Sequence, residues 1–259
     1  MQKFKLWTNS EQNKTEICYY PTTYKVSKGV VVIFPGGAYF CHADYEGEGY
    51  AAMINTLGLD AFVVHYRVLP ERFPLPLLDA RRAVRFIRAN ADKFGLDKDK
   101  MLVMGSSAGG HLAALLSTYY DEIEGECVDE IDREDYMPNG QILCYPVVCS
   151  DENVGHMGSY ENLLGDKFHE KDSLSPELLV SEKTPKAFIW HTSSDELVNV
   201  INSYRYAEAL AEHDIPCELH VFPVGRHGSA LAPNNVYVSS WIELLRKWLL
   251  FNGWIDTIA

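Results

Sequence analysis

The chain has 259 residues, 47% of them hydrophobic, and a formal net charge of −13. This is typical of one globular domain, expected over residues 1–259, and the negative charge without a basic stripe excludes a nucleic-acid partner. No apolar run approaches the ~20 residues that cross a bilayer. The polar first 16 residues are not a secretory signal. A cytoplasmic protein with no membrane contact and with six reduced cysteines is expected.

Apolar runs that suit buried strands alternate with helical patterns along most of the chain. The strand candidates are residues 16–20, 29–34, 61–67, 101–105, 141–145, 186–192 and 217–222. The helix candidates are residues 47–57, 76–94, 108–120, 199–213 and 236–251. Several strand candidates are solidly apolar, as strands covered on both faces are. The alternation predicts an α/β fold, a mostly parallel sheet with helices on both faces.

Two long connections interrupt this alternation. Residues 121–139 are strongly acidic and follow the helix that leads away from the expected site, so they indicate a solvated acidic loop remote from it. Residues 146–184 follow the carboxyl end of a strand, the edge where ligands bind in such sheets. We therefore expect 146–184 to form a small cap that shapes substrate choice.

Residues 105–110, with the sequence GSSAGG, lie between a strand candidate and a helix candidate. The pattern G-x-S-x-G at such a junction is the nucleophile elbow of serine hydrolases, so Ser107 is the predicted nucleophile. The turn is tight, which explains Gly105 and Gly109. The helix that follows presents the backbone N–H of Ala108 to a developing negative charge, as one donor of an oxyanion hole.

A serine nucleophile requires a base and an orienting acid, both expected after it in the chain. His227 occupies a glycine-flanked loop directly after the last strand candidate and is the predicted base, with His156 as the alternative. Asp195 follows the strand candidate 186–192 and is the predicted acid. Glu196 is its rival, because position alone does not separate adjacent carboxylates.

Further oxyanion donors are expected from the loop after strand candidate 29–34, where Gly37 and Ala38 are best placed. A simple glycine turn is the other interpretation of that loop. No metal-binding spacing and no dinucleotide or phosphate glycine fingerprint occurs, so no metal and no cofactor are expected. The side chains expected to line the substrate site are Tyr39, His42, His156 and Tyr160.

Residues 66–74 (YRVLPERFP), 78–80 and 105–110 resemble the hormone-sensitive-lipase-like esterase branch of the α/β-hydrolase superfamily. The chain departs from that pattern at Ser106, where an acidic residue is usual, and at Pro35 and Ala38 in the oxyanion loop. The stretches that are similar to acetyl-xylan and feruloyl esterases within this branch are 35–39, 45–50, 159–165 and 190–198.

The resemblance implies an α/β-hydrolase fold and a carboxylesterase that removes short acyl groups, acetyl first, from a small-molecule ester such as an acylated sugar. It also favours Asp195 over Glu196. Two alternatives remain. One is an amide-cleaving relative, such as an arylformamidase or a small peptidase, and the other is a catalytically silent fold used for binding. The presence of Ser107, Asp195 and His227 counts against the silent fold, because a binding module needs none of them.

Overall fold

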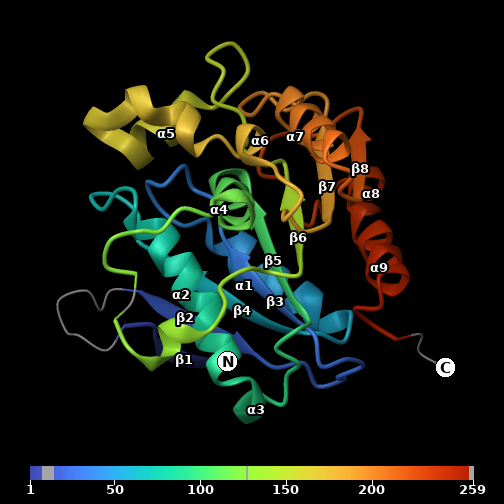
Figure 1. Ribbon diagram of the computed structural model, residues 1–259. Helices are drawn as coiled ribbons and strands as arrows, with labels where there is room; N and C mark the ends of the chain where they lie inside the picture. The colour runs from blue at the N-terminus through green and yellow to red at the C-terminus, as the bar shows by residue number, and fades with distance from the viewer. Residues whose placement is uncertain (8–14, 127, 257–259) are drawn as a thin grey trace.

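The computed structural model describes residues 1–7, 15–126 and 128–256. Its central element is a single twisted β-sheet. The eight strands lie in the order β1-β2-β4-β3-β5-β6-β7-β8 (Figure 1). They are β1 (Gln2–Lys5), β2 (Glu16–Tyr20), β3 (Val30–Phe34), β4 (Asp60–His65), β5 (Met101–Ser106), β6 (Gly140–Cys144), β7 (Ala187–Thr192) and β8 (Cys217–Phe222). The pairs β1–β2 and β2–β4 are antiparallel, and the pairs from β4 to β8 are parallel.

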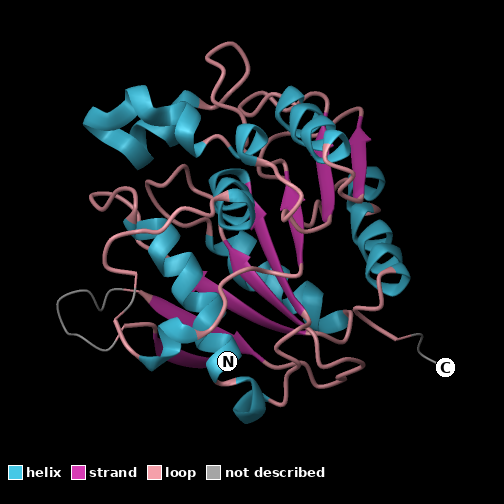
Figure 2. Ribbon diagram, viewed as in Figure 1, coloured by secondary structure: helices cyan, strands magenta, loops and turns pink. Residues whose placement is uncertain are grey.

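Helices cover both faces of this sheet (Figure 2). In β3, Val30, Val32 and Phe34 pack on one face and Val31 and Ile33 on the other, as the alternation of side chains along a strand requires. The first face carries α2 (Leu75–Ala89), α4 (Ser107–Thr118) and α7 (Ile201–Glu212). The second carries α1 (Asp44–Thr56), α8 (Val236–Ser239) and α9 (Trp241–Phe251). The predicted fold class is confirmed.

Several elements differ from the predicted ones. Strand β1 was not predicted, because its four residues are polar or half-exposed at the edge of the sheet. The helix expected over 76–94 is interrupted at Asn90, whose side-chain amide donates to the carbonyl of Phe86, and continues as α3 (Ala91–Phe94). The connection 146–184 is helical, with α5 (Met157–Leu164), η2 (Gly165–Leu174) and α6 (Pro176–Leu179).

The acidic segment 121–139 is only in part the solvated loop that its composition predicts: Glu130 and Asp135 are exposed, whereas Asp132 is buried. It contains the 3₁₀-helix η1 (Glu130–Arg133) and lies against α2. Buried arginines of α2 pair with its carboxylates: Arg81 with Glu126, Arg82 with Asp129 and Asp132, and Arg85 with Glu126. These ion pairs anchor one side of the segment to α2, while its outer carboxylates remain in solvent. The segment joins the end of α4 to the start of β6, so it lies at the amino ends of the parallel strands.

Within the described ranges, no helix is both long and apolar enough to span a bilayer. Five cysteines fall in the same ranges, and all five are free thiols. The sixth, Cys127, lies outside the described residues.

Candidate active site

Ser107 lies where β5 ends and α4 begins, with no residue between the two elements. Its φ is 52°, a left-handed conformation that costs a non-glycine residue about 1–2 kcal/mol. The flanking glycines permit the turn, because a Cβ on Gly105 would collide with the carbonyl of Gly109, and a Cβ on Gly109 with that of Phe34. The neighbouring Ser106 points inward, where its buried hydroxyl donates to Tyr50.

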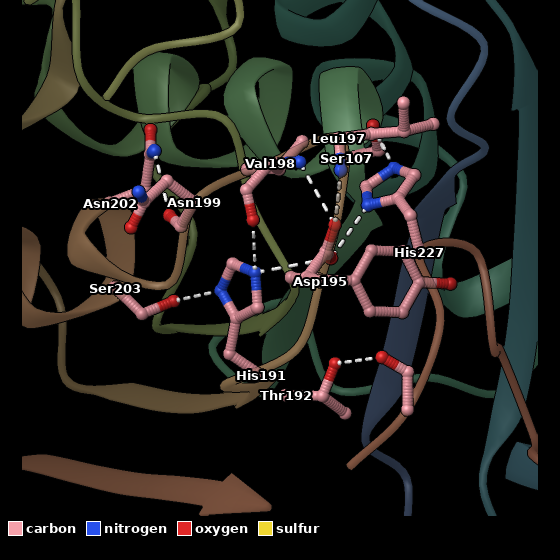
Figure 3. Close-up of polar contacts among 12 residues, drawn as sticks. Ser107, His191, Thr192, Asp195, Leu197, Val198, Asn199, Asn202, Ser203 and His227 are labelled. Atoms are coloured by element: carbon pink, nitrogen blue, oxygen red, sulfur yellow. Dashed lines mark hydrogen bonds and ion pairs between the residues drawn. The ribbon is translucent and has the colours of Figure 1, made fainter. Parts of the chain in front are cut away.

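Three side chains from different strand ends form one hydrogen-bonded chain (Figure 3). The hydroxyl of Ser107 lies 2.9 Å from Nε2 of His227, and Nδ1 of His227 lies 2.7 Å from Oδ2 of Asp195. These contacts assign the imidazole proton to Nδ1, which leaves Nε2 free to accept from the serine. The adjacent Glu196 does not reach the imidazole, since its carboxylate accepts the backbone N–H of His227 instead.

The carboxylate of Asp195 is almost fully buried and has several hydrogen-bond partners. Its Oδ1 accepts the backbone N–H groups of Leu197 and Val198 at 3.0 and 2.9 Å. Its Oδ2 lies 3.3 Å from Nε2 of His191 in addition to the contact with His227. Burial opposes ionisation, but hydrogen bonds from the two histidines outweigh it and hold the pKa of Asp195 below its usual range. Asp195 is therefore ionised at neutral pH.

The β3–α1 loop (residues 35–43) lies beside Ser107. A Cβ on Gly36 would approach the Cβ of Ser107 to 3.3 Å. Gly37 and Ala38 both have positive φ, 128° and 53°. Among the described residues, nothing accepts their two backbone N–H groups. The N–H of Ala108, in the first turn of α4, lacks an acceptor within its helix. Among the described residues, none of these three amides therefore has a hydrogen-bond acceptor.

An open cleft of about 470 Å³ contains Ser107 and His227. Its other lining residues are Gly37, Ala38, Phe40, Cys41, Ala43, Tyr45, Glu46, His156, Asn162, Leu197 and Gly228. His156 thus lies where the sequence analysis expects it. The side chain of His156 contacts the hydroxyl of Ser159 rather than the serine of the elbow.

Three of the expected substrate contacts are wrong, because their side chains belong to the packing around the cleft. Tyr39 is buried and its hydroxyl lies 2.6 Å from Nδ1 of His111. Tyr160 is also buried, with its ring against the imidazole of the same His111. His42 packs beside Tyr66, and burial lowers its pKa to about 4.

The local backbone explains these errors. Positive φ at both Ala38 and Tyr39 reverses the chain, so the following residues Phe40 and Cys41 face the cleft. In α5, Asn162 rather than Tyr160 lines the cleft, since residues two apart on a helix point about 200° from each other. The side-chain amide of Asn162 donates to the carbonyl of Ala38 at 2.8 Å.

Sequence reasoning also missed Glu46, a buried carboxylate of α1 at the edge of the cleft. Burial raises its pKa, while hydrogen bonds from the Tyr145 hydroxyl and the Gly36 N–H act in the opposite direction. The stretch 45–50, which resembles other esterases, was the available signal. In the part of the chain that is described, no cluster of histidine, cysteine and carboxylate side chains suits a metal ion.

This strand order, with parallel strands β3 to β8 and a sharp turn between β5 and α4, defines the α/β-hydrolase fold. Within it, the chain belongs to the BD-FAE family, whose sequence profile matches residues 17–210. The structure superposes on that of an acetyl ester-xyloside bifunctional hydrolase from Caldicellulosiruptor lactoaceticus with a TM-score of 0.91. The two are 38% identical, and the match covers 98% of this chain and 97% of that one.

Two curated relatives are longer proteins. The chain is 35% identical to endo-1,4-beta-xylanase B of Butyrivibrio fibrisolvens over 91% of its own length and 39% of that protein. It is 29% identical to acetylxylan esterase of Xylanibacter ruminicola over 96% of its own length and 50% of that protein. The chain therefore spans half or less of these relatives.

The strained turn generates a prediction about stability. Glycine adopts a φ of 52° without penalty whereas alanine does not, so Ser107→Gly should be more stable than Ser107→Ala by about 1 kcal/mol. The matched pair at Ser106, which has a φ of −117°, should show the reverse order. Urea unfolding of the four variants measures both differences. A Ser107→Gly protein that is less stable than Ser107→Ala contradicts the assignment of strain.

Proposed function

We propose that this protein is a serine carboxylesterase that hydrolyses short acyl esters, with acetyl esters of sugars as its substrates. The observation that carries the proposal is the hydrogen-bonded chain Ser107–His227–Asp195, which opens into a cleft beside unpaired backbone N–H groups. The esterase and xylan-related names of the relatives support the same chemistry.

In the proposed mechanism, Ser107 Oγ attacks the ester carbonyl carbon as its proton passes to Nε2 of His227. The N–H groups of Gly37, Ala38 and Ala108 bind the oxyanion of the tetrahedral intermediate. Asp195 stabilises the imidazolium, which then protonates the departing alcohol oxygen as the C–O bond breaks. Water, deprotonated by His227, attacks the acyl-enzyme, releases the carboxylic acid and restores the serine.

The composition of the cleft supports a small acyl group. Among the described lining residues, Leu197 is the only long aliphatic side chain, and it is 59% exposed. A fatty acyl chain gains ~0.8 kcal/mol for each CH₂ that leaves water, and this cleft offers little apolar surface to receive one. Acetyl therefore suits the site better than a long chain.

The cleft also presents exposed aromatic surface. Phe40 and Tyr45 both line it, and they remain 66% and 56% exposed. Exposed aromatic rings beside a nucleophile suit the flat apolar face of a sugar ring, which buries area against them. A catalytically silent fold has no use for an ionised acid, a correctly hydrogen-bonded histidine and a strained serine together, so we set that alternative aside.

The triad assignment predicts a graded set of losses. Ser107→Ala should lower kcat by about 10⁶, and adding His227→Ala should lower it little further because the groups act as a unit. Asp195→Asn should cost about 10⁴ in kcat, since the amide favours the wrong imidazole tautomer. The controls Ser106→Ala and Glu196→Gln should retain far more activity. The measurement is the kcat of each variant in steady-state hydrolysis of an acetyl ester. A Glu196→Gln enzyme with a lower kcat than Asp195→Asn would refute Asp195 as the acid of the triad.

Acyl-chain preference provides a second test. With a series of acyl lengths on one leaving alcohol, kcat/KM should peak at acetyl or propionyl and fall beyond butyryl, because the cleft lacks apolar surface for longer chains. A maximum at eight or more carbons would place the enzyme with lipases instead.

A third test addresses the sugar. Phe40→Ala should lower kcat/KM for an acetylated methyl xyloside by about tenfold, equivalent to about 1.4 kcal/mol of lost contact. For methyl acetate, whose alcohol is too small to reach the ring, the change should stay below about twofold. Tyr24→Ala, which removes an 83%-exposed aromatic ring that does not line this cleft, is the matched control. Equal losses on both substrates would contradict a sugar-stacking role.

A further inference from the structure

A buried glutamate lies beneath the β3–α1 loop and accepts a hydrogen bond on each of its two carboxylate oxygens. Glu46 has 2% of its surface exposed. Its Oε2 accepts the backbone N–H of Gly36 at 2.8 Å, and its Oε1 accepts the hydroxyl of Tyr145 at 2.6 Å. A buried carboxylate needs such partners, because an unpaired charge in the interior is strongly destabilising. The position of Gly36 is therefore tied to that of Tyr145.

Tyr145 in turn contacts the β8–α8 loop (residues 223–235), which carries His227. Its hydroxyl oxygen accepts the backbone N–H of Ala230 at 3.1 Å, and its ring centroid lies 5.1 Å from that of His227. Tyr145 follows β6 directly and has a φ of 38°, a left-handed conformation. Such a conformation persists in a non-glycine residue only where the surrounding contacts fix it.

The other side of the β3–α1 loop is held by Asn162, whose side-chain amide donates to the carbonyl of Ala38. The N–H groups of Gly37 and Ala38 lie between the two anchored groups, the Gly36 N–H and the Ala38 carbonyl. Donors that stabilise an oxyanion are effective when they are oriented before the charge develops. These anchors supply that orientation.

We propose that Glu46 is a positioning residue that, through Gly36 and Tyr145, fixes the oxyanion donors relative to the loop that carries His227. This role rests on the proposed function, because it acts on the same site. Glu46 does not take part in proton transfer. It sets the geometry in which Ser107 and His227 meet the tetrahedral intermediate.

The test compares Glu46→Ala with Glu46→Gln. Glu46→Ala removes both hydrogen bonds, so we expect a fall of about 10² in kcat and in the rate of fluorophosphonate labelling of Ser107, with KM within about threefold. The amide in Glu46→Gln still accepts from Gly36 and can donate to Tyr145, so both rates should stay within about tenfold of wild type. Glu48→Gln, an exposed position on the same helix, is the matched control and should behave as wild type.

Tyr145→Phe keeps the ring and removes only the hydroxyl, which contacts Glu46, the N–H of Ala230 and the hydroxyl of Tyr50. We expect about a tenfold fall in both rates in a protein that is still folded at the assay temperature, although its melting temperature should fall because Glu46 and Ala230 each lose a buried partner. Tyr24→Phe is the control. If Glu46→Ala does not fold, the rates of Tyr145→Phe and Glu46→Gln test whether Glu46 acts as a positioning residue.

The proposal is overturned if folded Glu46→Ala or Tyr145→Phe stays within about twofold of wild type, or if Glu46→Gln is as slow as Glu46→Ala. Equal loss in the last pair would assign the effect to charge rather than to position. A wild-type protein that is labelled but cleaves no ester would refute the proposed function while the labelling rates still test Glu46. A wild-type protein that is not labelled would overturn both.

Discussion

The backbone at Ser107 is the constraint on which the rest of the site depends. A strand passes into a helix without a connecting residue, which forces a positive φ on a serine and requires glycine at positions 105 and 109. The hydroxyl then lies at the start of α4, above the carboxyl end of β5, where the helix amides face outward. Asp195 and His227 reach this fixed point from the segments that follow β7 and β8, and the β3–α1 loop reaches it from the other side.

Parallel topology explains how distant segments meet there. Because β3, β5, β7 and β8 run in the same direction, the residues that follow them converge on one edge of the sheet. Buried carboxylates then hold the convergent loops: Asp195 orients His227 from one side, and Glu46 holds Gly36 from the other. Glu46 accepts two hydrogen bonds, and Asp195 accepts from two backbone N–H groups and from His227; buried polar groups need such partners out of contact with water.

The sequence could predict the features that depend on local pattern. Strand β3 is continuously apolar because it is covered on both faces, and the elbow at Ser107 is readable from its glycines. The direction in which side chains point in irregular segments could not be predicted from the sequence. The reversal at Tyr39 depends on φ values that a sequence does not reveal, and Glu46 looks like any surface glutamate of a helix until its partners are known. Likewise, the acidic composition of residues 121–139 did not reveal that Arg82 anchors part of the segment through Asp129 and Asp132.

The central claim is that Ser107 carries the acyl group during turnover. The most direct measurement is to quench the enzyme with acid during steady-state hydrolysis of an acetyl ester and to map the modified peptide by mass spectrometry. This account predicts an acetyl group on Ser107 that accumulates within the first turnover and disappears when the substrate is exhausted. Acetylation at another residue, or hydrolysis with no covalent intermediate detected even when deacylation is slowed by low temperature, would contradict it.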